Sequence, residues 1–405
     1  MDIPHTEFTF EYTAAEMHFG RNCVAKLDET LETVDVGQAM IVCGKNVGAN
    51  AETMDPITEG MGDRLGAIFD ETTPEKTLET VLDGVDRMEA EAADGLVAVG
   101  GGSSLNVARA MAALSAVDQS RSTLRDRIVS EETVPSPRPG DDPVPIVSIP
   151  TTLAGADVSS GGTIRLREES IVPPGTDAGP FSVRVSDPRL FAKAIFYDQE
   201  LFASTPTGAL VNSAMNGFNK GIETLYSRET NPISDAHAFH GLRHLATACP
   251  DIPEADADEP AYDHLVAGIP LVQYGRYTNI IHTFGNGINH HYDTQQGVAH
   301  AIMVAPVLEF IFERVDGRRR EIAAALDIDV RGSTDDEVSA MILDRVHSIR
   351  DALGLPTELR SVRGIEREHL PALAQVIAAN PKQERNPHDI DPTVEDIEEI
   401  LEQAW

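Results

Sequence analysis

The chain has 405 residues, of which 66 are acidic and 32 are basic, so its formal net charge is −34 and its pI is about 4.6. Hydrophobic residues make up 41% of the chain, which is enough to form buried cores and excludes wholesale disorder. The charge excludes a general nucleic-acid binder, because most of the surface would repel phosphates.

The 32 basic residues comprise 6 lysines and 26 arginines, so lysine is scarce in this chain. Together with the many acidic side chains, this composition is typical of proteins from a salt-accumulating microbe such as a halophilic archaeon. An acidic, hydrated surface stays soluble there while salt screens the charge repulsion. The alternative is an ordinary acidic protein. In either case the charge describes the solvent and says little about the substrate.

Neither disulfides nor membrane segments are predicted. Cys23, Cys43 and Cys249 lie far apart and lack the CxxC spacing of a zinc or redox site. No apolar run reaches the roughly 18 residues of a membrane span. Residues 1–10 lack the basic-then-apolar pattern of a signal peptide. We therefore expect a cytoplasmic protein without a membrane partner.

The first half of the chain alternates apolar runs with helical patterns. Buried strands are predicted at 38–43, 64–69, 95–99 and 144–149. Helical spacing follows at 74–93 and 107–114, so we expect an α/β domain whose mostly parallel sheet is covered on both faces. The charged, proline-rich stretch 118–143 is predicted to be a surface excursion. The glycines and prolines of 159–197 indicate a hairpin region.

Helical periodicity dominates after Pro206. Helices are predicted at 209–227, 234–249, 262–291, 299–314, 319–326, 335–353, 370–379 and 394–404. We therefore predict two domains, an α/β domain over 1–202 and an all-helical domain over 203–405.

Two loops follow predicted strands and carry the residue types of a nucleotide site. The first is GGGSS at 100–104, between a strand and a helix. Glycine lets the backbone approach a phosphate closely, and a helix N-terminus offers free N–H donors. The second is PTTLAGAD at 150–157, where Thr151 and Thr152 offer hydroxyls at the carboxyl end of the next strand. Each loop is also compatible with a plain turn, and neither matches the GxGxxG or P-loop spacing.

In this order the two loops resemble the iron-containing (group III) alcohol dehydrogenase family, with features of its maleylacetate reductase branch. Further motifs of the family follow at 187–188, 197–198, 201–206, 213–216, 223–226, 231–232, 282–285 and 297–301. The resemblance covers the chain from about residue 8 to its end. It implies a dinucleotide-binding α/β domain followed by a helical domain, an architecture shared with dehydroquinate synthase, and often a homodimer.

The resemblance implies a nicotinamide cofactor that lies on Gly101, Gly102, Ser103 and Ser104, with Thr151 and Thr152 nearby. Members of the family often place an acid after the strand that here ends at Cys43, where it accepts the ribose hydroxyls of NAD. This chain has Gly44 and Lys45 instead. Because a cation there favours a 2′-phosphate, NADP is preferred over NAD; a plain surface lysine is the alternative.

The resemblance also implies a metal site, but this chain departs from it. The family's ligands are an Asp, a His four residues later, and two His fourteen residues apart. These positions fall on Asn216, Lys220, His282 and Gln296, so only His282 is retained. Amides are poor ligands for a divalent ion, and an ammonium has no lone pair. We therefore expect no catalytic metal.

Lys220 replaces a metal ligand with an organic cation. An ammonium at that point can stabilise a developing alkoxide and donate a proton during carbonyl reduction, and Asn216, four residues earlier on the same helical face, can orient it. The alternative is an ion pair between Lys220 and Glu223. His282 is predicted to relay protons or bind substrate, because it begins a polar stripe with Asn286, Asn289 and His290; the alternative is a core histidine.

Two further groups of histidines invite a metal interpretation. His290, His291, Asp293 and His300 form one, and His237, His240 and His244 form the other, for which a hydrated helix face is the preferred explanation. Two functions stay open: an NAD(P)-dependent oxidoreductase that acts on a small alcohol or carbonyl without a metal, or a nucleotide-binding paralogue that has lost catalysis. A lyase of the related fold ranks third.

Overall fold

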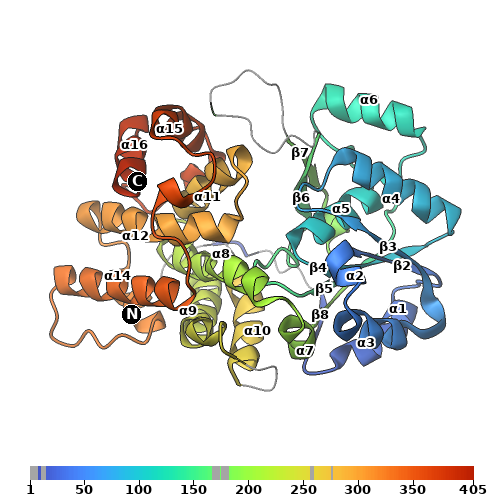
Figure 1. Ribbon diagram of the computed structural model, residues 1–405, viewed down its shortest axis with the longest axis horizontal. Coiled ribbons are helices and arrows are strands. Elements are labelled where there is room, and N and C mark those ends of the chain that lie inside the picture. The colour runs from blue at the N-terminus through green and yellow to red at the C-terminus, as the bar shows by residue number, and fades with distance from the viewer. Residues whose placement is uncertain (1–7, 11–14, 167–173, 175–181, 256–259, 275–276) are drawn as a thin grey trace. The chain divides into compact units, whose positions relative to one another are not determined.

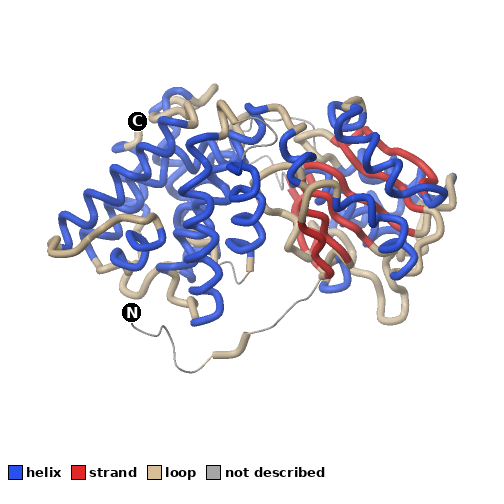
Figure 2. The backbone as a smooth tube through the Cα atoms, turned by 90° about the horizontal axis from the view of Figure 1, so that it is seen from below, coloured by secondary structure: helices blue, strands red, loops and turns tan. Residues whose placement is uncertain are grey.

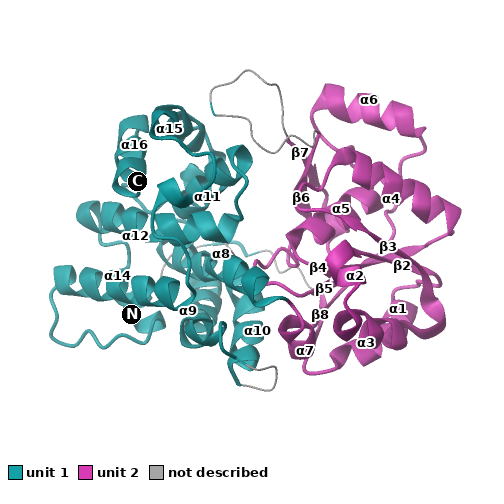
Figure 3. Ribbon diagram, in the orientation of Figure 1, with its two compact units in different colours: residues 1–12, 170–177, 206–405 teal, residues 13–169, 178–205 magenta. Residues whose placement is uncertain are grey.

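The computed structural model describes residues 8–10, 15–166, 174, 182–255, 260–274 and 277–405. These residues form two compact units, coloured separately in Figure 3. One unit contains 15–166 and 182–205, and the other contains 206–405 together with 8–10 and 174. The chain therefore passes from the first unit to the second at Pro206.

The first unit is built on a six-stranded parallel sheet. Its strands are β1 (Glu16–Phe19), β2 (Ala39–Gly44), β3 (Leu65–Thr72), β4 (Gly95–Gly100), β5 (Ile146–Pro150) and β8 (Ala194–Tyr197). Their order is β1-β8-β5-β4-β2-β3, and each neighbouring pair is parallel. The predicted mostly parallel sheet is thus confirmed. β1 was not predicted, because its four residues are too few to show a pattern.

Apolar side chains alternate to the two faces of this sheet and build one core on each. One core joins the sheet to α4 (Leu78–Ala90), α5 (Gly102–Ser115) and α6 (Arg121–Glu131). The other joins it to α1 (Leu27–Thr33), α3 (Ala51–Met61) and α7 (Gln199–Ala203). The short helix α2 (Lys45–Gly48) follows β2 directly (Figure 1). Because all strands are parallel, the loops that follow β2, β3, β4 and β5 gather at one edge of the sheet.

Two segments of this unit contain secondary structure that the sequence analysis did not predict in detail. The surface excursion predicted for 118–143 contains α6, whose N-cap is Ser120 and whose Leu124 and Ile128 are buried. The hairpin region contains the antiparallel pair β6 (Gly161–Arg165) and β7 (Ser182–Ser186). Residues 167–173 and 175–181 of the predicted hairpin region lie outside the described part of the chain.

The second unit is helical in its described residues, as Figure 2 shows. Its α-helices are α8 (Thr207–Tyr226), α9 (Pro232–Ala248), α10 (Pro260–Gln273), α11 (Ile280–His291), α12 (Gln296–Arg314), α13 (Arg319–Ala325), α14 (Asp335–Ala352), α15 (Leu370–Ala378) and α16 (Val394–Gln403). The predicted all-helical C-terminal region is confirmed. The single helix predicted at 262–291 is wrong, because α10 ends at Gln273 and Asn279 caps a new helix.

Only α12 among the described helices has the length and composition of a membrane span. Its apolar window is 72% buried within the protein, as expected of a core helix.

Candidate functional site

The glycine loop joins β4 to α5 as the sequence predicts. Gly100 has a φ of +118°, a conformation that side chains rarely adopt, and Gly101 is the N-cap of α5 without a side-chain cap. A Cβ on Gly101 would lie 3.2 Å from the Cγ2 of Thr152, and one on Gly102 would lie 3.3 Å from the Cβ of Ala156. The loops after β4 and β5 therefore touch, and the backbone N–H groups that begin α5 fit a pyrophosphate.

The predicted cofactor residues take different positions around this loop. The hydroxyl of Ser104 lies 2.9 Å from that of Thr72 and is buried, so it braces the loop rather than facing outward. Thr151 is also buried, and its carbonyl accepts a hydrogen bond of 2.9 Å from Thr205. Ser103 and Thr152 are half-buried, whereas Lys45 is exposed as the first residue of α2.

Arg109 is a residue that the sequence analysis missed. It is buried on α5, where its Nη2 donates to the carbonyls of Ala156 at 2.7 Å and Asp157 at 3.2 Å. The carboxylate of Asp157 accepts a hydrogen bond from Tyr197. Arg109 thus fastens the loop after β5 to the helix that begins at the glycine loop. An arginine inside the apolar pattern 107–114 was the available signal.

In the helical unit, the four positions of the family's metal ligands lie on three packed helices. α8 carries Asn216 and Lys220, α11 carries His282, and α12 begins at Gln296. A Cβ on Gly297 would lie 1.9 Å from the carbonyl oxygen of Asn212, so only glycine allows α12 to approach α8 this closely. The close approach places Gln296 beside Asn216.

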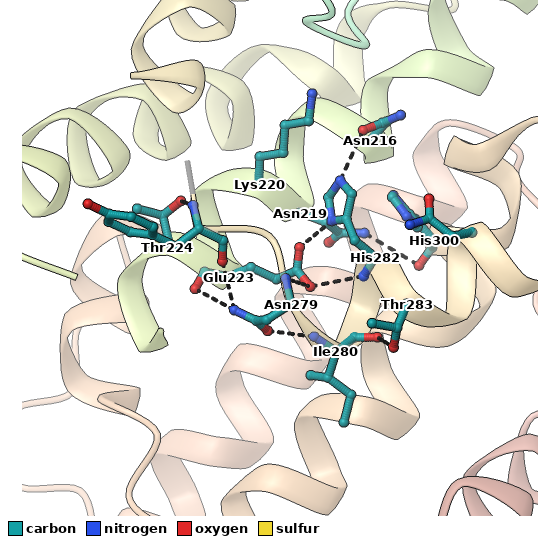
Figure 4. A network of polar contacts seen from close by, with 12 residues as sticks. Asn216, Asn219, Lys220, Glu223, Thr224, Asn279, Ile280, His282, Thr283 and His300 are labelled. Atoms are coloured by element: carbon teal, nitrogen blue, oxygen red, sulfur yellow. Dashed lines mark hydrogen bonds and ion pairs between the residues drawn. The ribbon is translucent and has the colours of Figure 1, made fainter. Parts of the chain in front are cut away.

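Hydrogen bonds connect these side chains in one network (Figure 4). Nε2 of His282 lies 3.3 Å from Oδ1 of Asn216, and Nδ2 of Asn216 donates to Gln296 at 3.0 Å. Nε2 of Gln296 in turn donates to Asn286 at 2.5 Å. Two ligand positions of the family are therefore occupied by amides that bind each other.

Glu223 holds His282 in this network. The carboxylate is fully buried, accepts from the backbone N–H groups of Asn279 at 3.1 Å and His282 at 2.9 Å, and pairs with Nδ1 of His282. Burial raises the pKa of Glu223 above its usual range. The Glu223 carboxylate therefore pairs with His282 and not with Lys220, which was the alternative partner considered for it.

The Lys220 side chain is only 7% exposed, and its Nζ donates to Oε1 of Gln273 at 3.2 Å. In Figure 4, Lys220 and Asn216 extend past the His282 ring on the side away from Glu223. The ammonium of Lys220, the amide of Asn216 and Nε2 of His282 are thus presented on one side of the network.

His300 is a second buried histidine at this site, and its ring centre lies 4.3 Å from that of His282. Burial and His282 lower the pKa of His300 well below its usual value. The metal group proposed for His290, His291, Asp293 and His300 is wrong, because His300 lies in the core whereas His290 and Asp293 are exposed.

The other histidine group, His237, His240 and His244, lies on α9, where a hydrated helix face is expected. His244 is half-buried, and its Nδ1 lies 2.7 Å from Nδ1 of His264, so this helix face is not purely hydrated. Within the described ranges, no three His, Cys, Asp or Glu side chains are grouped to hold a metal ion. Asn216, Lys220, His282 and Gln296 do not fit a divalent metal either, because they offer one imidazole, two amides and a cation.

Residues 14–198 match the model of the iron-containing alcohol dehydrogenases, and residues 210–405 match that of the C-terminal domain of the Fe-containing alcohol dehydrogenase family. The chain belongs to the iron-containing alcohol dehydrogenase family and is an alcohol dehydrogenase-like enzyme.

Similar proteins include lactaldehyde reductase of Escherichia coli (strain K12), which is 26% identical over 394 residues covering 96% of this chain and 97% of the relative. Maleylacetate reductase of Rhizobium sp. (strain MTP-10005) is 22% identical over 381 residues, 92% of each chain. The structure of sulfoacetaldehyde reductase from Bifidobacterium kashiwanohense in complex with NAD+ has a TM-score of 0.81 at 19% identity, covering 98% of this chain and 99% of that one. The predicted family and fold are confirmed.

Proposed function

We propose that this protein reduces a small carbonyl compound, or oxidises the corresponding alcohol, with a nicotinamide cofactor and without a catalytic metal. The observation that carries the proposal is the buried Lys220 at a family ligand position, beside Asn216 and Nε2 of His282. The lactaldehyde and maleylacetate reductases among its relatives support small carbonyl substrates.

A nicotinamide cofactor, when bound, would supply or accept a hydride. When a carbonyl carbon is reduced, its oxygen gains negative charge and then needs a proton. Lys220 can stabilise that oxygen with its ammonium, which is the task that a metal ion performs in a Lewis-acid mechanism. Lys220 or Nε2 of His282 can provide the proton. Asn216 positions His282 through the 3.3 Å contact.

The proposed cofactor site consists of Gly101, Gly102 and Ser103, with Thr151 and Thr152 on the adjoining loop. We propose NADPH rather than NADH, because β2 ends at Gly44 and is followed by Lys45, so the end of this strand presents no acid for the ribose hydroxyls. We also expect a cytoplasmic homodimer, which a measurement of native mass would test.

Turnover in the presence of a chelator tests the metal-free mechanism. The protein is purified with EDTA in high salt, and NADPH oxidation is followed with a panel of aldehydes and keto acids. We expect activity in wild type, loss of at least about a hundredfold in kcat for Lys220→Met, and wild-type activity for the exposed control Lys193→Met. Activity that depends on added zinc or iron would refute the proposal.

The same experiment addresses the paralogue hypothesis. If wild type binds NADPH but turns over no member of the panel, with or without added metal, the nucleotide-binding function without catalysis is favoured. Retention of cofactor binding in Lys220→Met separates a defect in chemistry from a defect in folding.

A further inference from the structure

Glu223 is a fully buried carboxylate whose two oxygens have different partners. Oε1 accepts hydrogen bonds from the backbone N–H groups of Asn279 at 3.1 Å and His282 at 2.9 Å. These groups belong to the N-cap and the first turn of α11, where N–H groups have no acceptor within the helix. Oε2 pairs with Nδ1 of the His282 ring. One oxygen therefore caps the helix, and the other contacts the ring.

The contact at Oε2 decides where one proton of the His282 ring lies. An ionised carboxylate has no donor of its own, so its hydrogen bond to the ring requires a proton that Oε2 and Nδ1 share. The two backbone N–H groups keep Oε1 as an acceptor, so the carboxylate is fixed in this orientation. Glu223 therefore holds a proton at Nδ1.

The amides on the other side of the ring indicate a second proton, on Nε2 (Figure 4). Oδ1 of Asn216 lies 3.3 Å from Nε2 of His282. Asn216 keeps this orientation because its Nδ2 donates to Gln296 at 3.0 Å, and Gln296 in turn donates to Asn286 at 2.5 Å. An oxygen that faces Nε2 requires an N–H group there. The pair of His282 and Glu223 therefore holds two protons.

We propose that Glu223 is a positioning residue that makes His282, rather than Lys220, the proton donor in carbonyl reduction. As the carbonyl oxygen gains negative charge, an O–H bond forms to it while the Nε2–H bond breaks, and the bonding pair stays on Nε2. The shared proton then belongs to Nδ1, which leaves a neutral ring beside an ionised carboxylate. Lys220 keeps its proton and stabilises the oxygen as a cation. This inference rests on the proposed function for the reaction that consumes the proton.

The contact between Nε2 and Asn216 suits a proton that is transferred. At 3.3 Å it is longer than most N–H···O hydrogen bonds, so a substrate oxygen can replace Oδ1 of Asn216 as the acceptor. Such an oxygen would lie on the side of the His282 ring toward which Lys220 also extends (Figure 4). The donor and the cation can therefore act on the same atom.

Replacement of Glu223 by glutamine tests this role while the helix cap is kept. The two backbone N–H groups require an oxygen, so the new amide must keep its oxygen on them and turn its NH2 group toward Nδ1. Nδ1 then accepts a hydrogen bond, and the ring keeps a single proton, on Nε2. A neutral imidazole that lost this proton would become an anion, so His282 could no longer act as the acid.

Ring nitrogen chemical shifts of His282 report which of its nitrogens carry protons, and they are measured by NMR in the protein without cofactor. The signals are assigned by their absence in His282→Gln. We expect a proton on Nε2 in both wild type and Glu223→Gln, and a proton on Nδ1 in wild type alone.

Turnover of the carbonyl panel with NADPH provides the second readout. Glu223→Gln should lower kcat by about a hundred- to ten-thousandfold and change KM for the carbonyl compound by less than about threefold. The matched control is Glu313→Gln on α12, where the side chain is 75% exposed, and it should behave as wild type.

The outcomes separate this role from a structural one. An unprotonated Nε2 in wild type would overturn the proposal, because Lys220 would then be the donor. An unchanged kcat in folded Glu223→Gln would overturn it as well and would show that Glu223 only caps α11. If circular dichroism shows that Glu223→Gln does not fold, the ring shifts of wild type decide the question. Wild type without turnover would reject the proposed function, whereas protons on both ring nitrogens would still support the placement of protons by Glu223.

Discussion

The four side chains at the family's metal positions show how single residues change the chemistry that a fold can support. Lys220 is the decisive one, because an ammonium repels a divalent cation as well as failing to ligate it. The side-chain amides of Asn216 and Gln296 are hydrogen-bonded to each other, with Nδ2 of Asn216 donating to Oε1 of Gln296 at 3.0 Å. His282 is held from both ring nitrogens, by Glu223 and Asn216.

Restoring the ligands should therefore restore metal binding. The triple variant Asn216→Asp, Lys220→His, Gln296→His would add one carboxylate and two imidazoles to His282, the donor set that zinc and iron prefer. We expect about one equivalent of zinc after dialysis, measured by mass spectrometry, and none in wild type. Asn216→Asp alone should bind none, because Lys220 remains. Stoichiometric metal in purified wild type would contradict the prediction.

Lys76 should lower the stability of the fold at neutral pH. Lys76 lies between β3 and α4, and its folded pKa of about 8 is below the ordinary lysine value of 10.5, so the unfolded chain binds the proton more tightly. The cost of burying the charge is complete below pH 8 and disappears as the pH rises from about 8 to 10.5, and it is at most about 3 kcal/mol.

Lys76→Met should accordingly be more stable than wild type at pH 7, with a difference that shrinks toward pH 10. Urea unfolding at a series of pH values measures this, with Lys193→Met as the control whose difference stays near zero. A constant or growing advantage of Lys76→Met with rising pH would show that the charge is not the cause.

Helix packing decides whether the residues of the helical unit meet. The contact of α8 with α12 at Gly297 leaves no room for a Cβ, since that atom would lie 1.9 Å from a backbone oxygen that cannot move aside easily. Gly208, in the first turn of α8, has nothing within 4 Å of its Cβ position. Both glycines lie in the first turn of a helix, but only Gly297 lacks room for a Cβ, so Gly208 can serve as the control for a substitution at Gly297.

Gly297→Ala should lower the free energy of unfolding by about 1–3 kcal/mol through overpacking and should weaken the contact between Gln296 and Asn216. Gly208→Ala should be neutral or stabilise slightly, because alanine favours the helix. Denaturant unfolding of both variants provides the measurement. Equal effects in the two variants would mean that α8 and α12 are not closely packed at Gly297.

Most elements could be predicted because their patterns are long and local. The continuous apolar runs that became β2, β4 and β5 are buried on both faces, and α8 and α12 show clear helical spacing. The break between α10 and α11 was missed, because the apolar periodicity continues across it while Asn279 starts a new helix with its side chain. α6 was missed because charged residues hide its two buried positions, Leu124 and Ile128.

The candidate site could be predicted only in part. Motif order located Asn216, Lys220, His282 and Gln296, but hydrogen bonds between residues about 80 positions apart, such as Asn216 with Gln296, depend on tertiary packing. Arg109 and Lys76 act through backbone carbonyls and a distant hydroxyl, which leave no motif. Partners of this kind become visible only when the chain is folded.

At the scale of the whole molecule, the net charge of −34 sets the conditions under which both units are stable. Two effects of salt oppose each other. Salt weakens surface ion pairs such as that between Arg367 and Glu402, but exposed pairs contribute only about 0–1 kcal/mol each. Salt also screens the repulsion among the excess acidic residues, which acts between every pair of them and favours the unfolded chain.

The repulsion acts over a longer range and among more charged residues than the local ion pairs do, so its screening should dominate. The melting temperature should therefore rise as sodium chloride increases from about 0.1 M to about 1 M. Over this range the Debye length falls from about 10 Å to about 3 Å. Thermal unfolding monitored by circular dichroism measures the shift. Sucrose, which strengthens burial without screening charge, serves as the control and should give a smaller gain at equal osmolality. A melting temperature that falls with salt would show that the local ion pairs outweigh the net charge, and the acidic surface would then need an explanation other than adaptation to brine.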